Sequence, residues 1–173
     1  MRTLAIFAAS ACLLAGYAGT AQAQTASVEL KPTQGNKASG TAKFTKQGDR
    51  IMVEAKVEGL TPGLHGFHIH EKGDCSAPDA TSAGGHFNPA KAEHGNPASG
   101  AHHGGDLGNL DANTKGVATL NTSVQGQGLS MDKEGANSIV GRSVVVHADP
   151  DDFKSQPAGN SGKRIACGVI SLK

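Results

Sequence analysis

The stretch GFHIH at residues 66–70 alternates apolar side chains with histidines. Successive side chains of a β-strand point to opposite faces, so residues two apart share a face. We therefore expect Phe67 and Ile69 to enter a core, with His68 and His70 projecting together from the other face. The alternation predicts a strand that presents a pair of histidines.

Histidines are concentrated around this strand. Of the eight in the chain, seven lie among the 39 residues from His65 to His103. A lone histidine is most often structural, whereas this density indicates metal binding, for which imidazole is a common ligand. His65 has the opposite parity to the pair in GFHIH, and we interpret it as a buried structural residue held by hydrogen bonds.

Short runs with β-type alternation, separated by Gly, Asn, Asp or Pro, predict eight strands in one domain. Residues 72–105 and 148–163 interrupt this rhythm because both are rich in Gly, Pro, Asp and Ser. Loops this long in a compact domain are uncommon and usually functional. The expected strands are Ser27–Lys31, Ser39–Lys46, Arg50–Val57, Leu64–Glu71, Asp106–Asp111, Lys115–Thr122, Arg142–His147 and Ile165–Ser171.

Composition narrows the function classes. Lys and Arg number 16 against 15 Asp and Glu, so the formal charge of +1 offers no basic surface for nucleic acid. The chain has 24 Gly but only five Phe, one Tyr and no Trp, which favours strands and turns around a thin aliphatic core. We expect such a core to need reinforcement beyond its own packing.

Residues 1–23 have the features of a secretory signal peptide. Arg2 precedes an apolar run from Leu4 to Ala18, and the sequence Ala-Gln-Ala at 21–23 has the small residues that signal peptidase requires. We expect cleavage before Gln24, which leaves residues 24–173 as one periplasmic domain with no membrane association. A membrane anchor is the alternative, but the run is short for a span. Cys12 lies inside the run rather than after it, which argues against a lipoprotein anchor.

Cleavage would leave two cysteines, Cys75 and Cys167, in an oxidising compartment. Two cysteines allow one intramolecular disulfide, and the closed loop of roughly 90 residues would stabilise the fold by a few kcal/mol in the chain-entropy model. Two free buried thiols are the alternative.

Five further motifs follow GFHIH in order: GGHFNP (84–89), AEHGNP (92–97), HHGGDLG (102–108), VVVH (144–147) and KRIACGVI (163–170). Together the six resemble the secreted bacterial copper,zinc superoxide dismutases, and the similarity extends from about Val28 to Lys173. The resemblance implies an all-β fold, an eight-stranded Greek-key β-barrel or sandwich with two long functional loops. It implies conversion of two superoxide anions and two protons to dioxygen and hydrogen peroxide by alternating copper(II) and copper(I), as an antioxidant defence outside the cytoplasm.

The resemblance also implies one copper and one zinc per subunit. Four imidazoles suit copper(II), and three imidazoles with one carboxylate suit tetrahedral zinc. The shared histidine would lose both ring protons between two cations and, by the same resemblance, would take up a proton during catalysis. Matched motif by motif, the copper ligands are His68, His70, His86 and His147, and the zinc ligands are His86, His94, His103 and Asp106. The family spacing selects His103, so we expect its neighbour His102 to be an exposed loop residue.

Three further residues take roles from the resemblance. Asp151 occupies the position whose carboxylate links a copper-ligand histidine to a zinc-ligand histidine, and we expect it to connect His68 and His94. Arg164 matches the cation that docks superoxide beside copper, which suits its fixed fork of donors. Cys75 matches the disulfide partner of Cys167.

Three residues near the expected copper site bear on how an anion would reach it. Lys154 and Lys163 are the local cations that would attract an anion to a protein of near-zero charge. Ala158 stands where many relatives have Thr at the channel rim, so we expect a wider channel. A monomer and a homodimer are both compatible with the resemblance, and we find no apolar surface stripe that selects one.

Two other functions compete with the enzyme. A copper and zinc buffer or carrier would use the same metal ligands without catalysis, but an inactive relative would be expected to lack some copper ligands or Arg164. A zinc hydrolase would need an open zinc position and a general base. The spacing His103-x-x-Asp106 with two further histidines closes the zinc site instead.

Overall fold

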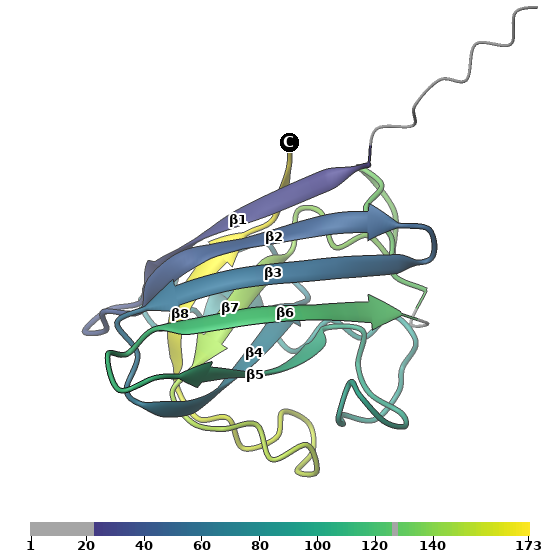
Figure 1. Cartoon of the computed structure of the whole chain (residues 1–173). Helices are drawn as coiled ribbons and strands as arrows, with labels where there is room; N and C mark the ends of the chain where they lie inside the picture. Colours follow the sequence, from purple (N-terminus) through teal and green to yellow (C-terminus); the bar gives the residue numbers. More distant parts are fainter. Residues whose placement is uncertain (1–22, 126–127) are drawn as a thin grey trace, which may run out of the picture.

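The computed structural model describes residues 23–125 and 128–173. The expected signal peptide therefore lies outside the described residues except for Ala23. Within the described part, no helix is long and apolar enough to cross a membrane. The elements (Figure 1) are β1 (Thr25–Pro32), β2 (Ser39–Gln47), β3 (Arg50–Glu58), β4 (Gly63–His70), the 3-10 helix η1 (Thr81–Ala83), β5 (Asp106–Ala112), β6 (Ala118–Gln125), β7 (Ser143–His147), β8 (Arg164–Val169) and β9 (Ser171–Leu172).

The strands close into an antiparallel barrel. Eight of them follow one another in the order β2-β3-β6-β5-β4-β7-β8-β1, and β1 pairs with β2 to complete the ring. The connection from β3 to β4 skips β6 and β5, and the connection from β6 to β7 skips back past β5 and β4. Such long returns are Greek-key connections, so the predicted eight-stranded all-β barrel is confirmed. The short β9 pairs with the beginning of β1.

Alternation along the strands separates the barrel interior from its outer face. In β3 the side chains of Ile51, Val53, Ala55 and Val57 are buried in the core, while those between them face outward. Phe67 and Ile69 of β4 are fully buried in the same core, as the parity of GFHIH predicts. The histidines between and beside them therefore lie outside the barrel wall.

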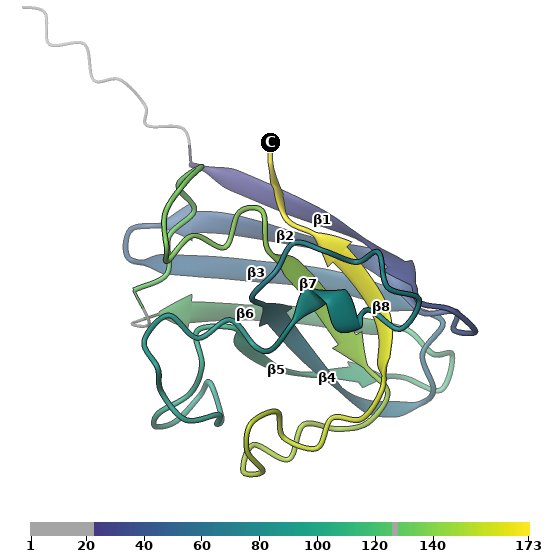
Figure 2. The ribbon, with the colours of Figure 1, turned by 180° about the vertical axis from the view of Figure 1, so that it is seen from behind.

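Both predicted long loops are present, and they cover part of this outer face. Figure 2 shows the first loop, with η1, crossing the side of the barrel that holds β4, β7 and β8, while the second loop projects near it. His68 and His70 point away from the barrel core, yet their exposed fractions are 0% and 1%. The loops thus create a second buried compartment outside the barrel.

Most strand boundaries differ from the expected ones by one to three residues. β6 begins at Ala118 rather than Lys115, because the Asn113 side chain accepts hydrogen bonds from the N–H groups of Lys115 and Val117 and holds a turn. The last strand is divided at Ile170, whose N–H donates to the carbonyl of Arg142. Residues 128–142 belong to a third long connection, between β6 and β7, in a stretch that the expected strands left unassigned except for Arg142.

Candidate metal centre

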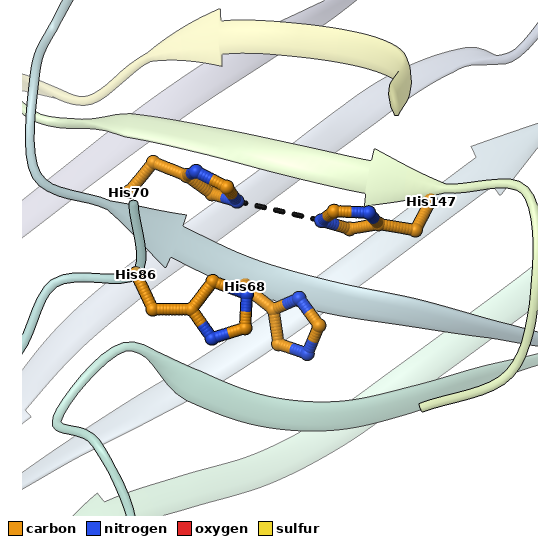
Figure 3. Close-up of side chains that lie close together, drawn as sticks. All are labelled: His68, His70, His86 and His147. Carbon is orange, nitrogen blue, oxygen red and sulfur yellow. Dashed lines mark hydrogen bonds between the residues drawn. The ribbon is translucent and has the colours of Figure 1, made fainter. Parts of the chain in front are cut away.

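Four histidines meet outside the barrel wall (Figure 3). His68 and His70 come from β4, His147 is the last residue of β7, and His86 comes from the first long loop. One ring nitrogen of each lies within 4.8 Å of those of the others. The strand register shifts between Gly66 and His68 and again next to His147, and bulges of this kind re-aim side chains beside functional sites.

Hydrogen bonds occupy one ring nitrogen of the strand histidines and leave the other facing inward. His70 donates from Nδ1 to the Gly84 carbonyl at 2.9 Å, and His147 donates from Nδ1 to the Gly162 carbonyl at 3.3 Å. Their Nε2 atoms then face each other at 3.4 Å, along the dashed line in Figure 3. His68 donates from Nε2 to Asp151 at 2.7 Å, which turns its Nδ1 toward the other three rings. Each bond selects the tautomer that presents a lone pair to a cation.

A second group shares His86 with the first. It consists of His86, His94, His103 and Asp106, whose donor atoms also lie within 4.8 Å of one another. The Asp106 carboxylate, at the beginning of β5, lies at its centre: Oδ1 is 2.8 Å from His86 Nδ1 and Oδ2 is 3.0 Å from His94 Nδ1. The third ring, His103, has its Nδ1 at 3.5 Å from Oδ1. Three imidazoles and one carboxylate are a donor set that suits tetrahedral zinc.

Unpartnered buried atoms support metal binding at both groups. Buried polar atoms nearly always have hydrogen-bond partners, because leaving one without costs about 1–3 kcal/mol. Among the described residues, His68 Nδ1 and His86 Nε2 are buried with no partner, and His94 Nδ1 and His103 Nδ1 have none except the Asp106 carboxylate beside them. Since all four belong to the two groups, the residues fit a copper ion among four imidazoles and a zinc ion in the second group.

The Asp151 carboxylate joins the two groups. Its Oδ2 accepts from His68 Nε2 at 2.7 Å and its Oδ1 accepts from His94 Nε2 at 2.9 Å. The main chain of Asp151 is held by Asn109, which donates to its carbonyl at 3.0 Å and accepts from its N–H at 2.8 Å. One carboxylate therefore fixes the orientation of a ring in each group.

The pKa values of the histidine rings are lowered by burial and raised by the carboxylates of Asp106 and Asp151, and the balance differs from ring to ring. Burial lowers the pKa of His86 to about 4, and the hydrogen bond to Asp106 opposes this only in part. Burial also lowers the pKa values of His70 and His147 well below their ordinary value. At His94 burial acts in the same direction, but hydrogen bonds to Asp106 and Asp151 outweigh it and raise the pKa to about 9.

The carboxylates respond in the opposite sense. Burial alone would raise the pKa of Asp106, but hydrogen bonds from His103, His86 and His94 hold it well below the usual range. The pKa of Asp151 is likewise lowered, because the bonds from His68 and His94 outweigh burial. The carboxylates of Asp106 and Asp151 therefore both carry a negative charge at neutral pH. A carboxylate must be ionised in this way to bind a metal.

A cavity of about 400 Å³ opens over the first group. Arg164 lies in its wall, with Nη1 donating to the Ala80 carbonyl and Nη2 to the Gly84 carbonyl, each at 2.7 Å. The rim includes Pro157 and Ala158, so residue 158 contributes a methyl group and no hydroxyl to the cavity. A small anion entering this cavity would meet the guanidinium beside His70, His86 and His147.

A disulfide joins Cys75 in the first long loop to Cys167 in β8, 92 residues apart. The pair packs against Ala80, Ala83 and Val145. Since Ala80 supplies one of the carbonyls that hold Arg164, the disulfide supports the segment that positions this side chain.

Two histidines outside the groups have structural contacts. His65 is buried, as its parity predicts; its Nδ1 donates to the His147 carbonyl at 2.8 Å and its Nε2 lies 2.9 Å from the Thr61 carbonyl. The expectation for His102 was wrong. Its exposed fraction is only 5%, and its Nδ1 donates to the carbonyl of its neighbour His103 at 2.7 Å, because the loop turns back on itself there.

The two lysines expected to attract anions are exposed but do not line the cavity. One residue that sequence reasoning missed is Gln156, whose side-chain amide forms two hydrogen bonds with the main chain of His94. No spacing or motif marks it, because the contact joins two irregular loops.

Residues 38–170 match the family model described as copper/zinc superoxide dismutase (SODC). The chain belongs to this family. Membership agrees with the Greek-key barrel and with the two histidine groups that share His86. The protein is an oxidoreductase that acts on superoxide, and the metals of its family are copper and zinc.

Proposed function

We propose that superoxide is dismuted at the floor of the Arg164 cavity, with copper held by His68, His70, His86 and His147 and zinc held by His86, His94, His103 and Asp106. The observation that carries this proposal is the sharing of His86 by two donor groups that contain every unpartnered buried side-chain atom among the described residues. A bound copper ion would supply the one-electron redox chemistry, and zinc would supply fixed positive charge.

The side chains around the cavity have separate roles in this proposal. Arg164 binds and orients the superoxide anion, because its guanidinium is charged and its fork is anchored on two carbonyls. His86 holds a proton at Nε2 when that atom is not bound to metal, and delivers it to the reduced oxygen species. Asp106 and Asp151 keep the zinc-side rings oriented while this proton moves.

The structure also bears on the rival functions. A hydrolytic zinc site keeps one position open for water, whereas the second group already offers four protein donors. A buffer or carrier has no need of a cation fixed over the copper group, and Arg164 stands in the wall of the cavity above it. Both features favour catalysis on a small anion.

The deciding experiment loads the purified protein with copper and zinc and follows superoxide decay by pulse radiolysis. Decay far faster than with the metal-free protein supports the enzyme. Stoichiometric binding of both metals with no acceleration would instead identify a buffer. A His86→Ala variant with cobalt in place of zinc provides a structural test, because loss of the copper–cobalt magnetic coupling in the EPR spectrum is expected if His86 bridges the metals.

We further infer export to the periplasm. Disulfides persist in oxidising compartments, and Cys75 and Cys167 form one. The signal-like sequence of residues 1–23 supports the same location. Mass spectrometry of protein recovered from a periplasmic extract tests this, with an N-terminus at Gln24 as the expected result. Sedimentation equilibrium of the same material would distinguish a monomer from a homodimer.

A further inference from the structure

The main chain of His94 lies in an irregular part of the first long loop, outside any strand or helix. Its N–H donates to Gln156 Oε1 at 2.9 Å, and its carbonyl accepts from Gln156 Nε2 at 2.9 Å. In the part of the chain that the structure describes, no other backbone group pairs with either atom. The side-chain amide of Gln156 thus satisfies both polar groups of one residue, as a neighbouring strand would.

The ring of His94 is held independently of this contact. Its Nε2 donates to Asp151 and its Nδ1 lies beside Asp106. A histidine that binds a metal needs both its ring and its backbone held in place. A shift of the backbone moves the metal-binding ring nitrogen even when the hydrogen bond from the other ring nitrogen is kept. Gln156 supplies the backbone constraint that the two carboxylates do not.

The two hydrogen bonds of Gln156 also hold the second long loop against the first. Residues 152–161 are closed on themselves by internal bonds, including those from Asp152 N–H to the Gly159 carbonyl and from Gly159 N–H to the Ser155 carbonyl. In the described part of the chain, Gln156 makes the only hydrogen bonds from these ten residues to the loop of metal ligands at 86–106. Pro157 and Ala158, which follow it directly, form the rim of the Arg164 cavity.

We propose that Gln156 is a positioning residue that couples the zinc group to the rim of the substrate cavity. Holding the backbone of His94 in place favours zinc binding, and zinc binding in turn orders the rim through the same pair of hydrogen bonds. This inference rests on the proposed assignment of zinc to the second group. It gives the amide side chain at this position a function that neither a carboxylate nor an apolar side chain of similar length can replace.

Two nearly isosteric variants separate the two hydrogen bonds. Gln156→Met removes both, whereas Gln156→Glu retains an acceptor for the His94 N–H but replaces the donor to its carbonyl with an oxygen. Asn96→Asp is the matched control: it adds a negative charge two residues from His94, and its Oδ1 still accepts the hydrogen bond from the Ala98 N–H.

The first measurement is zinc affinity, by competition with a chromophoric chelator. Loss of one net hydrogen bond corresponds to roughly fivefold to tenfold weaker binding, so we expect Gln156→Glu to bind zinc about tenfold more weakly and Gln156→Met at least as weakly. Asn96→Asp should bind as tightly as the unchanged protein. Equal affinities in all four proteins would overturn the positioning role, whereas failure of the unchanged protein to bind zinc would overturn the proposed function instead.

The second measurement is amide hydrogen exchange by NMR, which does not depend on activity. In the metal-free protein, exchange at the His94 N–H should be accelerated in Gln156→Met but much less in Gln156→Glu, while amides in the barrel strands remain unchanged. Zinc should slow exchange at Gly159 and Ser161 in the unchanged protein and less so in Gln156→Met. Equal protection of these two amides by zinc in both proteins would overturn the coupling to the rim.

Discussion

Gly159 packs directly against the carboxylate of Asp151, so that a Cβ atom at Gly159 would overlap Asp151 Oδ1 and approach His94 Nε2. Gly159 also has a φ of +62°, a left-handed conformation that disfavours residues with a Cβ. The backbone of the second loop therefore packs against the hydrogen bond from His94 Nε2 to Asp151 Oδ1, an atom of the carboxylate that joins the two histidine groups.

This contact makes Gly159→Ala a test of the link through Asp151. The added methyl group should displace the carboxylate, and loss of such a ligand-orienting contact typically weakens metal binding by about 10–100-fold. We expect a drop of this size in zinc affinity, measured by chelator competition. Gly48→Ala is the control, because Gly48 has the same φ of +62° but nothing within 4 Å of its Cβ position. Similar zinc affinities for the two variants would show that Gly159 does not act through Asp151.

Zinc binding should release a proton from His94. The pKa of this ring is raised to about 9, because its hydrogen bonds to Asp106 and Asp151 outweigh burial. At pH 7 the metal-free ring is therefore protonated and must lose about one proton to bind zinc. We expect calorimetric titrations in buffers of different ionisation enthalpy to detect this proton, and zinc affinity to rise with pH until about pH 9. Zinc binding without proton release at pH 7 would contradict the assignment.

The metal-free protein should lose stability on mild acidification. The pKa of His86 is lowered to about 4 and those of His70 and His147 are also lowered, in each case mainly by burial. Between pH 6.5 and pH 4 the unfolded chain therefore binds more protons at these rings than the folded one, so the free energy of unfolding falls as the pH falls. His94 has a raised pKa, and its stabilisation is fully present below pH 6.5 and is lost only as the pH rises through about 9.

Urea denaturation at several pH values measures this dependence. A His86→Gln variant cannot titrate at that position, so its unfolding free energy should vary less steeply between pH 6.5 and pH 4. An equally steep dependence in this variant would assign the effect to other groups.

Arg164→Lys should lower activity without removing metal. Arg164 donates to two carbonyls at once, and an ammonium group cannot reproduce this planar fork. Local cations raise the association rate of a small anion by roughly 10–1,000-fold, so we expect the variant, which keeps its charge but loses its position, to have a roughly tenfold lower kcat/KM in pulse radiolysis. Unchanged copper and zinc contents exclude loss of metal, and Arg50→Lys on the exposed beginning of β3 is the control. Full activity in Arg164→Lys would show that charge alone is sufficient.

The disulfide should contribute to both stability and activity. Loss of a native disulfide typically lowers the free energy of unfolding by about 2–5 kcal/mol, and we expect a decrease in this range for Cys75→Ser. Because Ala80 packs in the same cluster as the disulfide and holds Arg164, activity should fall further than the metal content does. Thermal unfolding and metal analysis of the same samples measure both effects; unchanged activity at full metal content would separate the disulfide from the position of Arg164.

The parts of the structure that depend on local periodicity could be predicted from the sequence. The alternation in GFHIH correctly separated Phe67 and Ile69 from the histidine pair, because a strand has a side-chain period of two. Turn residues likewise marked the eight strands and two of the long loops. Five of the six ordered motifs supplied the donor sets that the structure brings together at His86.

The contacts that could not be predicted depend on the path of irregular backbone. His102 is buried only because its loop brings its ring to the carbonyl of the next residue. Gln156 meets His94 across 62 positions of sequence, with no periodic pattern to indicate the pairing. Met131 and Ile139, in the connection between β6 and β7, are buried in the barrel core although they lie outside any strand, and no periodic pattern marked them as core residues.

The Gly84 carbonyl accepts hydrogen bonds from both His70 and Arg164. Under the proposed function, His70 binds copper and Arg164 binds the substrate, so a single oxygen atom holds one side chain of each kind. A displacement of the Gly84 peptide would move both side chains together. The distance between the copper site and the bound anion would therefore depend on the position of one peptide group.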